Sequence, residues 1–323
     1  MSFSEIKEPI KQELEQFEEH FKGAIRSKVP FVDVIARYIV KQKGKKIRPI
    51  LVMLTAQACG GINTSTYRGA SLVEILHTAT LIHDDVVDDA DTRRGLASIN
   101  AVWKNKIAVL MGDYMLAKGL LLSLDNDDFQ FLKIISDSVR RMSEAEILQI
   151  KKSRDLDIDE ATYLKIISDK TASLIATCTR IGAASATKEP VLLERMKEYG
   201  ENLGMVFQIR DDLLDYTGRK SITGKPTGLD VKEKKLTLPL IHSLAKAPNN
   251  RSKQAIKIIK NGASNKELQE LVNFAYEFGG IDYATKKAEH YSSLAFKALE
   301  ALPTSDAKEA LREFVKFVME RSK

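Results

Sequence analysis

Apolar residues recur along most of the chain at three- and four-residue steps, which is the spacing of an amphipathic helix. Ile6, Ile10, Leu14, Phe17 and Phe21 follow it and predict one opening helix, in which Pro9 falls early, where a helix tolerates proline. The same periodicity predicts further helices over 47–59, 67–89, 107–124, 129–151, 158–184, 191–216, 236–245, 265–278, 281–302 and 306–321. Alternating β-branched runs are scarce. The pattern therefore predicts an all-α protein.

Two features of this pattern bear on the architecture. Segment 107–124 is nearly all apolar, which predicts a central buried helix. Between the helices, 89–99 and 185–190 are expected to be loops, and 217–235 is too polar and glycine-rich for a core, so we expect a mobile flap there. No shift in composition marks a boundary, so one domain is expected over 1–323.

Composition narrows the classes of function. Of the 323 residues, 44% are hydrophobic, enough for a sizeable core, and the net charge of +6 fits anionic small substrates or weak attraction to an anionic membrane surface. No dense basic run with interleaved aromatics occurs, so no nucleic-acid partner is expected. Cys59 and Cys178 lie in separate apolar segments, which argues against a disulfide scaffold or a zinc site.

The sequence shows no clear targeting signal or membrane span. Its first residues are charged and amphipathic, unlike a signal peptide, and no run of 18 apolar residues predicts a membrane span. We therefore expect a cytoplasmic protein with at most peripheral membrane contact.

One aspartate pattern occurs twice, as Asp84-Asp85-Val86-Val87-Asp88 and as Asp211-Asp212-Leu213-Leu214-Asp215. On a helix the first and fifth positions lie on one face, so each motif gathers carboxylates there. A solvated acidic face would explain one copy, but not the apolar neighbours of both. Like charges among apolar residues repel each other and lose hydration, and a bound cation relieves both penalties. The motifs therefore predict sites for hard cations that hold a diphosphate.

Basic residues cluster beside these carboxylates. Arg93 and Arg94 follow the first motif, and the other candidates lie at Lys45, Arg48, Lys170, Lys225 and Lys235. Arginine forks suit phosphate oxygens, and lysine supplies a point charge. Each residue alone would pass as a surface residue. Together with two acidic clusters, they suit two anionic groups, one held through metal and one held directly.

Two polar residues share the helical faces of the motifs. His77 lies on one stripe with Leu81, Asp84 and Asp88, so it is either a core histidine or, as its position favours, a substrate contact. Gln208 lies one turn before Asp211 and Asp212, where it could bond a diphosphate oxygen or orient a carboxylate.

Several longer segments carry a family resemblance. GKKIRP, EILHTATLIHDDVVDDADTRRG, VLMGDYMLA, DKTASLI, GMVFQIRDDLLDY and GKPTGLDVKEKKLTLPLI, spread in order over residues 44–241, resemble the trans-polyprenyl diphosphate synthases, close to the octaprenyl type. The resemblance implies an isoprenoid synthase-type bundle of antiparallel helices around a central cavity, usually in a homodimer. It also implies three Mg²⁺ ions that bridge an allylic diphosphate.

The resemblance assigns roles to matching positions. The metal ligands are Asp84, Asp88, Asp211, Asp212 and Asp215, with Asp85 in support, and the catalytic set is Asp84, Asp85, Asp88, Lys170, Asp211 and Lys225. Isopentenyl diphosphate is held by Lys45, Arg48, His77 and Arg94, and the allylic diphosphate by Arg93, Lys170, Thr171, Gln208, Lys225 and Lys235. The chain departs from the pattern at Lys43 and Lys234, where the family often has glycine.

The implied reaction joins isopentenyl diphosphate to an allylic prenyl diphosphate such as farnesyl diphosphate. Ala79 and Thr80, one turn before Asp84, are small and leave room for a growing tail, so we expect a long all-trans product near C40 for quinone side chains. Ala79 could instead only pack against a neighbouring helix, with the tunnel floor deeper, among Met111, Met115 and Leu122.

Three other functions stay open at this stage. A shorter-chain synthase would carry the same motifs. A class I terpene cyclase needs no second diphosphate site, so GKKIRP and Arg93-Arg94 argue against it. A non-catalytic synthase subunit would be expected to lose one aspartate cluster, and both are intact here.

Overall fold

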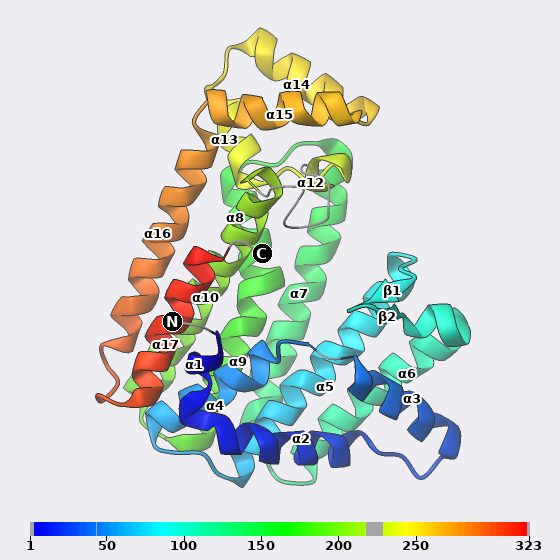
Figure 1. Cartoon of the computed structure of the whole chain (residues 1–323), viewed down its shortest axis with the longest axis vertical. Coiled ribbons are helices and arrows are strands. Elements are labelled where there is room, and N and C mark those ends of the chain that lie inside the picture. The colour runs from blue at the N-terminus through cyan, green and yellow to red at the C-terminus, as the bar shows by residue number, and fades with distance from the viewer. Residues whose placement is uncertain (1–2, 43, 218–228, 322–323) are drawn as a thin grey trace.

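The structure, a computed structural model, describes residues 3–42, 44–217 and 229–321, and helices dominate them (Figure 1). The all-α prediction is confirmed. The helices are α1 (Phe3–Ile6), α2 (Lys11–Ile25), α3 (Pro30–Lys41), α4 (Ile47–Cys59), α5 (Thr64–Val87), α6 (Ile99–Leu124), α7 (Phe129–Asp155), α8 (Glu160–Ile167), α9 (Ser173–Ala186), α10 (Pro190–Thr217), α12 (Leu229–Lys232), α13 (Leu238–Lys246), α14 (Asn249–Asn261), α15 (Asn265–Glu277), α16 (Gly280–Leu299) and α17 (Asp306–Glu320). A π-helix, Ser168–Ala172, joins α8 to α9.

The start of the chain differs from the prediction. In place of one opening helix, the structure has α1, a 3-10 turn over Glu8–Ile10 and then α2. Pro9 lies in that turn. Proline has no N–H and disfavours helical backbone at the residue before it, so the helix breaks here.

Four further elements were not predicted from the sequence. These are α3, α12 inside the predicted flap 217–235, α14, and a small antiparallel hairpin of β1 (Thr92–Arg93) and β2 (Leu96–Ala97) inside the predicted loop 89–99. α14 buries only Ala255 and Ile259, so its apolar periodicity is weak.

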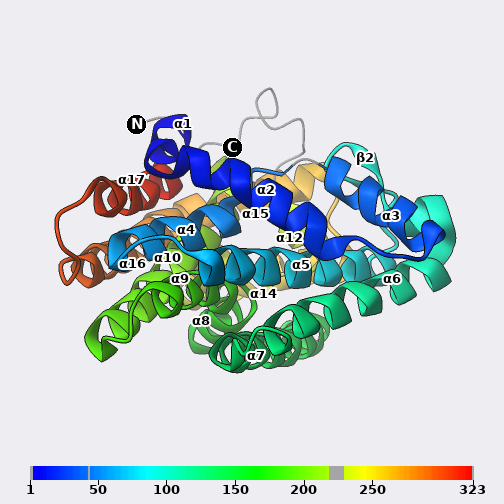
Figure 2. The same ribbon diagram turned by 90° about the horizontal axis from the view of Figure 1, so that it is seen from below.

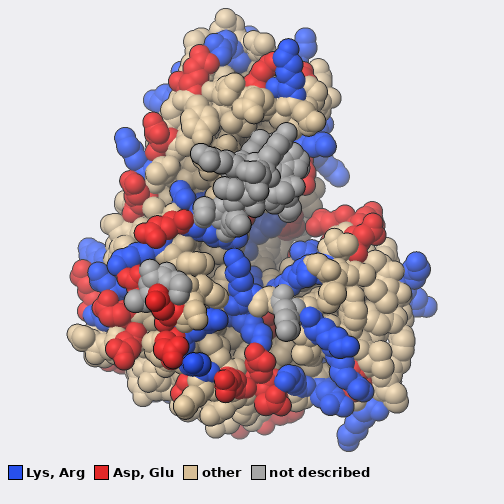
Figure 3. All heavy atoms as spheres, in the orientation of Figure 1, with Lys and Arg blue, Asp and Glu red and all other residues tan. Residues whose placement is uncertain are grey.

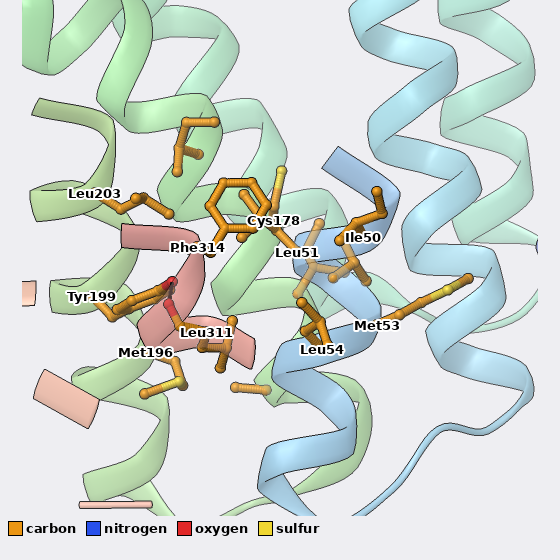
Figure 4. Packing of buried hydrophobic residues seen from close by; sticks show 14 of the residues in the cluster. Ile50, Leu51, Met53, Leu54, Cys178, Met196, Tyr199, Leu203, Leu311 and Phe314 are labelled. Atoms are coloured by element: carbon orange, nitrogen blue, oxygen red, sulfur yellow. Dashed lines mark hydrogen bonds between the residues drawn. The ribbon is translucent and has the colours of Figure 1, made fainter. Parts of the chain in front are cut away.

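The main core lies where α4, α9, α10 and α17 meet (Figure 4). Tyr199 on α10 is buried there and donates a hydrogen bond to the carbonyl of Leu311 on α17 (2.9 Å). Glycines let the backbones approach, because a Cβ at Gly182 would lie 2.3 Å from the Val52 carbonyl, and one at Gly200 would lie 2.5 Å from Ala176 Cα. α9 is therefore held tightly between α4 and α10, the helix that carries the second aspartate motif.

The prediction that 107–124 forms a central buried helix is wrong. That segment is the later part of α6, which lies at the edge of the molecule (Figures 1 and 2). Met111 and Met115 are buried in a cluster shared with α3 and α5, but Leu110 on another face is 56% exposed. Among the described helices, α6 alone is long and apolar enough to cross a membrane, judged by length and composition only. The apolar sequence indicated that the side chains of α6 favour burial, but it did not indicate which surface would bury them.

Seen from below, α2 and α3 lie over α4 and α5, and α6 and α7 lie on the opposite side (Figure 2). Side chains of Lys and Arg gather around a hollow in the front face of the molecule (Figure 3).

Candidate active site

The first aspartate motif occupies the last turn of α5. That helix starts at a capping box, in which the Asn63 side chain accepts a hydrogen bond from Thr66 N and the Thr66 hydroxyl accepts one from Asn63 N (both 3.2 Å). It ends at Val87, and Asp88 follows as its exposed cap. The motif therefore projects from a helix terminus.

Asp85 is buried and faces away from solvent. Its Oδ1 accepts a hydrogen bond from Arg93 Nε on β1 (2.8 Å), and the Arg93 Nη2 also contacts this oxygen. Asn100 Nδ2 donates to the Asp85 carbonyl (3.2 Å). Asp85 thus ties the hairpin to α5, which fits its predicted supporting role. Arg93, predicted to hold the allylic diphosphate, lies against this carboxylate.

The second motif lies near the end of α10. Asp212 is buried, and its carboxylate accepts hydrogen bonds from Tyr163 Oη on α8 (2.6 Å) and Gln208 Nε2 (2.7 Å). Burial raises the pKa of Asp212 to about 7 despite these hydrogen bonds. The contact with Asp212 fits one of the two predicted roles of Gln208, and a hydrogen bond to a diphosphate oxygen stays a prediction. Both oxygens of Asp212 are occupied, and its predicted role as a metal ligand stays a prediction.

The other two aspartates of this motif have different neighbours. Asp211 is half-exposed, and Arg321 Nη1 near the end of α17 lies 3.5 Å from its Oδ1. Asp215 Oδ2 accepts a hydrogen bond from the backbone of Asp230 (3.1 Å). Burial, followed by the repulsion from Asp215, raises the pKa of Asp230 to about 6. Asp230 therefore adds a carboxylate that the motif spacing did not predict.

Lys170 lies between the two motifs. Its Nζ donates to Gln149 Oε1 on α7 (2.8 Å) and pairs with Glu146. Partial burial raises the pKa of Asp84. The nearby charges of Asp88 and Glu146 raise this pKa further, and the charge of Lys170 opposes the rise. Next to Lys170, the Thr171 hydroxyl donates to Gln208 Oε1 (2.8 Å). Lys170 and Asp84, 86 positions apart in sequence, thus lie close enough to interact electrostatically.

The residues predicted to hold isopentenyl diphosphate also come together. Lys45 and Arg94 line a cavity of about 890 Å³ beside the first motif. A Cβ at Gly44 would lie 2.5 Å from Arg94 Nη1, so a larger residue there would displace the end of the Arg94 side chain. Burial lowers the pKa of His77 well below its usual 6.5, and the charges of Arg48, Arg94 and Arg93 lower it further. His77 is therefore neutral among three arginines.

Two buried polar atoms in this region have no partner among the described residues. They are Arg48 Nε on α4 and Glu74 Oε2 on α5. Burial lowers the pKa of Arg48, and the charge of Glu74 opposes this, so the two groups are neighbours. A buried polar atom without a partner is costly, and a bound anion is one group that satisfies Arg48.

The loop before α13 matches the family pattern only in part. Lys225 lies outside the described residues, as does most of the predicted flap. Lys235 Nζ pairs with Glu233 (2.6 Å), and its side chain lines a small cavity with Lys170, Thr171, Gln208 and Asp212. Lys234 adopts a φ of 60°, the left-handed region that favours glycine, at the position where the family often has one. Lys235 nevertheless lies beside the second motif.

The side chains of Ala79 and Thr80 lie in different environments. Ala79 is buried in the α3–α5–α6 cluster with Met111 and Met115. Thr80 is partly buried, and its hydroxyl donates to the His77 carbonyl (2.8 Å). The structure thus shows for Ala79 the packing contact that was the alternative to a tunnel wall, and the tunnel role stays a prediction.

Sequence reasoning missed several residues of this site: Glu74, Glu146, Gln149, Tyr163, Asp230 and Arg321. Glu74 had a signal, because it lies one helical turn before His77. Tyr163 and Arg321 had none, since each reaches its aspartate only through tertiary packing.

The oxygen donors of the two motifs suit a hard divalent cation. Within the described ranges, however, no three acidic, histidine or cysteine side chains converge closely enough to hold an ion by themselves. Mg²⁺ commonly binds through one or two carboxylates and completes its shell with water and substrate phosphates. The residues present fit that mode, in which the ion and the diphosphate bind together.

Comparison with known proteins supports the same assignment. The polyprenyl synthetase family matches residues 29–275. An all-trans-nonaprenyl-diphosphate synthase (geranyl-diphosphate specific) of Rhodobacter capsulatus is 35% identical over 98% of this chain and 97% of its own length.

Two solved structures are similar over nearly the whole chain. A polyprenyl synthase from Caulobacter crescentus, complexed with calcium and isoprenyl diphosphate, is 31% identical with a TM-score of 0.89, covering 100% of this chain and 98% of its own. A geranylgeranyl pyrophosphate synthase from Bacteroides thetaiotaomicron is 35% identical with a TM-score of 0.82, covering 98% and 99%. On its motifs, its fold and these matches, the chain belongs to the polyprenyl synthetase family of prenyl diphosphate synthases.

Proposed function

We propose that this prenyl diphosphate synthase condenses isopentenyl diphosphate with an allylic prenyl diphosphate, such as farnesyl diphosphate, to make an all-trans polyprenyl diphosphate near C40 for quinone side chains. The position of Lys170 carries the proposal. It lies between two carboxylate clusters, while a separate basic cavity holds Lys45 and Arg94. Two anion sites of different chemistry suit a reaction of two diphosphates, and a cyclase needs one.

Each residue then has a task in the reaction. Asp84, Asp88, Asp211 and Asp215 would hold Mg²⁺, three ions per site by family resemblance, and when bound the metal would neutralise charge on the leaving diphosphate. Lys170, Lys225 and Lys235 stabilise the same charge, and Thr171 and Gln208 orient the site around it. As the allylic C–O bond breaks, the alkene of isopentenyl diphosphate forms the new C–C bond, and a proton leaves to the departing diphosphate.

The second substrate is held on the other side of the cleft. Lys45, Arg48 and Arg94 bind its diphosphate, and neutral His77 offers a hydrogen bond without adding charge. Arg93 is held by Asp85 and lines the same cavity as Lys45 and Arg94, and family resemblance assigns it to the allylic diphosphate. The cleft must exclude water, because water would quench the allylic cation.

The product length rests on the small side chains of Ala79 and Thr80. The named relatives do not fix it, since one makes a nonaprenyl product and another is a geranylgeranyl pyrophosphate synthase. We propose that small residues one turn before Asp84 let the tail pass the C15 and C20 stages. We also infer one synthase domain over 1–323, because α10 contributes to both of the larger core clusters.

The exposed apolar face of α6 supports a homodimer. Leu110, Leu120, Leu121 and Leu124 are exposed on this helix, and Phe129 follows at the start of α7. A face of this kind matches a second copy of itself across a two-fold axis. We propose a cytoplasmic dimer without a nucleic-acid partner, which touches membranes at most peripherally to release its product.

A product assay tests the function. The purified chain, incubated with isopentenyl diphosphate, farnesyl diphosphate and Mg²⁺, is expected to give a dephosphorylated product near C40 on chromatography. A cyclised hydrocarbon, or no product, would refute the proposal. Growth that stops at C20, after one condensation, would refute only the long-chain part.

The Ala79→Tyr variant tests the control of length, with Ala79→Ser as the matched small control. The larger ring must displace Met111 and Met115 or enter the tail path, so the product is expected to shorten to about C15–C20 while the first condensation survives. If Ala79→Tyr still makes the full product, Ala79 only packs against α6.

A further inference from the structure

The segment that carries Lys170 and Thr171 is a distorted turn of helix. Between α8 and α9 the backbone widens into the π-helix Ser168–Ala172, where the N–H of Ser173 bonds to the Ser168 carbonyl five residues back. π-turns are rare and costly within helices and occur most often at functional sites. Something must therefore hold this turn in its wide form.

A partly buried ion-pair network contacts the turn from outside. The Asp169 side chain is 14% exposed and accepts hydrogen bonds from Arg141 Nε on α7 (2.7 Å) and from Lys165 Nζ on α8 (2.9 Å). Arg141 also lies 3.4 Å from Ser168 Oγ and 3.7 Å from Glu201 on α10. Through these contacts, α7, α8 and α10 all converge on the turn.

Two further contacts hold its backbone. The Ser173 hydroxyl donates to the Asp169 carbonyl (2.6 Å) and accepts from Ser138 Oγ (3.1 Å), which lies one turn before Arg141 on α7. On the other side, a Cβ at Gly204 would lie 2.4 Å from Ala172 Cα, so α10 presses directly on the turn. Arg141 and Ser138 thus form a two-point clamp from one helix.

The inner side of the turn leads to the second aspartate motif. Thr171 donates to Gln208, and Gln208 donates to Asp212 (2.8 and 2.7 Å). Lys170 points to Gln149 and Glu146 in the cleft. A shift of the turn would therefore move Lys170 and disturb the hydrogen bonds that orient the motif.

We propose that Arg141 is a positioning residue, which holds the π-turn through Asp169 so that Lys170 and Thr171 reach the allylic diphosphate. This role rests on the proposed function. Arg141 does not line either cavity of the site, so it acts through the turn and not on the substrate. Its effect falls on one substrate, because the isopentenyl site is built from α4, α5 and the hairpin.

The neighbouring Arg140 provides a matched control. It has the same side chain and also forms ion pairs, with Asp137 (2.9 Å) and Glu144 (3.0 Å), but it is 59% exposed and faces away from the turn. Arg141→Gln is expected to lower kcat about 10- to 100-fold and raise the KM for the allylic substrate, with the KM for isopentenyl diphosphate within about 2-fold. Arg140→Gln is expected to match the wild type, and Arg141→Lys to recover part of the loss.

A second measurement needs no turnover. Hydrogen–deuterium exchange of the amides in 166–176 is expected to be at least about 10-fold faster in Arg141→Gln than in Arg140→Gln. Kinetics and exchange that match the Arg140→Gln control would overturn the proposal. So would equal rises in both KM values with a lowered Tm, which indicate general loosening. If the wild-type protein shows no prenyl transfer, the proposed function is refuted instead. The hydrogen–deuterium exchange of the two variants then still decides whether Arg141 holds the turn.

Discussion

The two aspartate motifs have the same spacing, yet their buried middle aspartates are neutralised in different ways. Asp85 on α5 pairs with the Arg93 guanidinium, whereas Asp212 on α10 accepts hydrogen bonds from the neutral Tyr163 and Gln208. The neutral donors of Asp212 compensate its burial only in part, so the pKa of Asp212 rises to about 7. The first motif is thus held by an ion pair, and the second by a chain of hydrogen bonds that runs from Asp212 through Gln208 to Thr171.

The difference suggests a division of labour. The first motif is braced by the hairpin that also carries Arg94, and so it is built together with the isopentenyl site. The second is braced by α8 and the π-turn, and so it is built together with Lys170. Substitutions on the two sides are therefore expected to affect different substrates.

The largest effect is expected where the motifs are alike. Asp84→Ala and Asp211→Ala each remove a carboxylate from the metal face, and turnover is expected to fall by several orders of magnitude while the fold survives, since like-charge repulsion is relieved. Steady-state kinetics with Mg²⁺ titration and circular dichroism check this. Near-normal turnover of either variant at saturating Mg²⁺ contradicts metal binding by that motif.

The next effect separates the two substrates. Lys45→Ala and Arg94→Ala are expected to raise the KM for isopentenyl diphosphate about 10- to 100-fold, because a charge-assisted contact contributes roughly 1.5–3 kcal/mol. The KM for the allylic substrate is expected to change much less. Kinetics that vary one substrate at a time decide this, and the reverse pattern would exchange the two assignments.

A smaller effect compares the two buried aspartates directly. At pH 8 in EDTA, Asp85→Asn is expected to destabilise the chain by about 1–3 kcal/mol, because Arg93 loses its charged partner. Asp212→Asn is expected to be neutral or stabilising at that pH. Its folded pKa lies above the unfolded value, so the wild type loses stability as pH rises from about 4 to 7, and the asparagine removes this loss. Urea unfolding at pH 5 and pH 8 measures both, and equal effects of the two variants would erase the distinction.

The smallest effect concerns His77. Because its pKa is depressed, the unfolded chain binds a proton near pH 6.5 that the folded chain does not, and stability falls as pH drops below that value. His77→Gln is expected to reduce this slope by at most about 1.4 kcal/mol per pH unit, and to leave the pH profile of the isopentenyl KM between 6 and 8 unchanged. A profile that flattens in His77→Gln would show that His77 titrates in the working range.

Helical periodicity gave most element positions, because it depends on local side-chain spacing. It joined α8, the π-turn and α9 into one helix, since widening by one residue leaves little trace in an apolar pattern. It also wrongly predicted that α6 is buried in the centre of the molecule. Periodicity shows which face of a helix is apolar, but not which surface packs against that face. The motif spacing located both aspartate clusters for the same local reason.

The sequence by itself determined the helical class, the two motif-bearing helices and the basic residues that accompany them, because each depends on neighbours within a few turns. Only the tertiary structure decided which aspartate of each motif is buried. Asp85 on α5 meets Arg93 on the hairpin, and Asp212 meets Tyr163, 49 residues away in sequence, once α8 packs on α10. It also decided that Arg141 reaches Asp169 across α7 and the π-turn. Such contacts depend on how helices pack, and a one-dimensional pattern of polar and apolar positions does not encode the choice of partner.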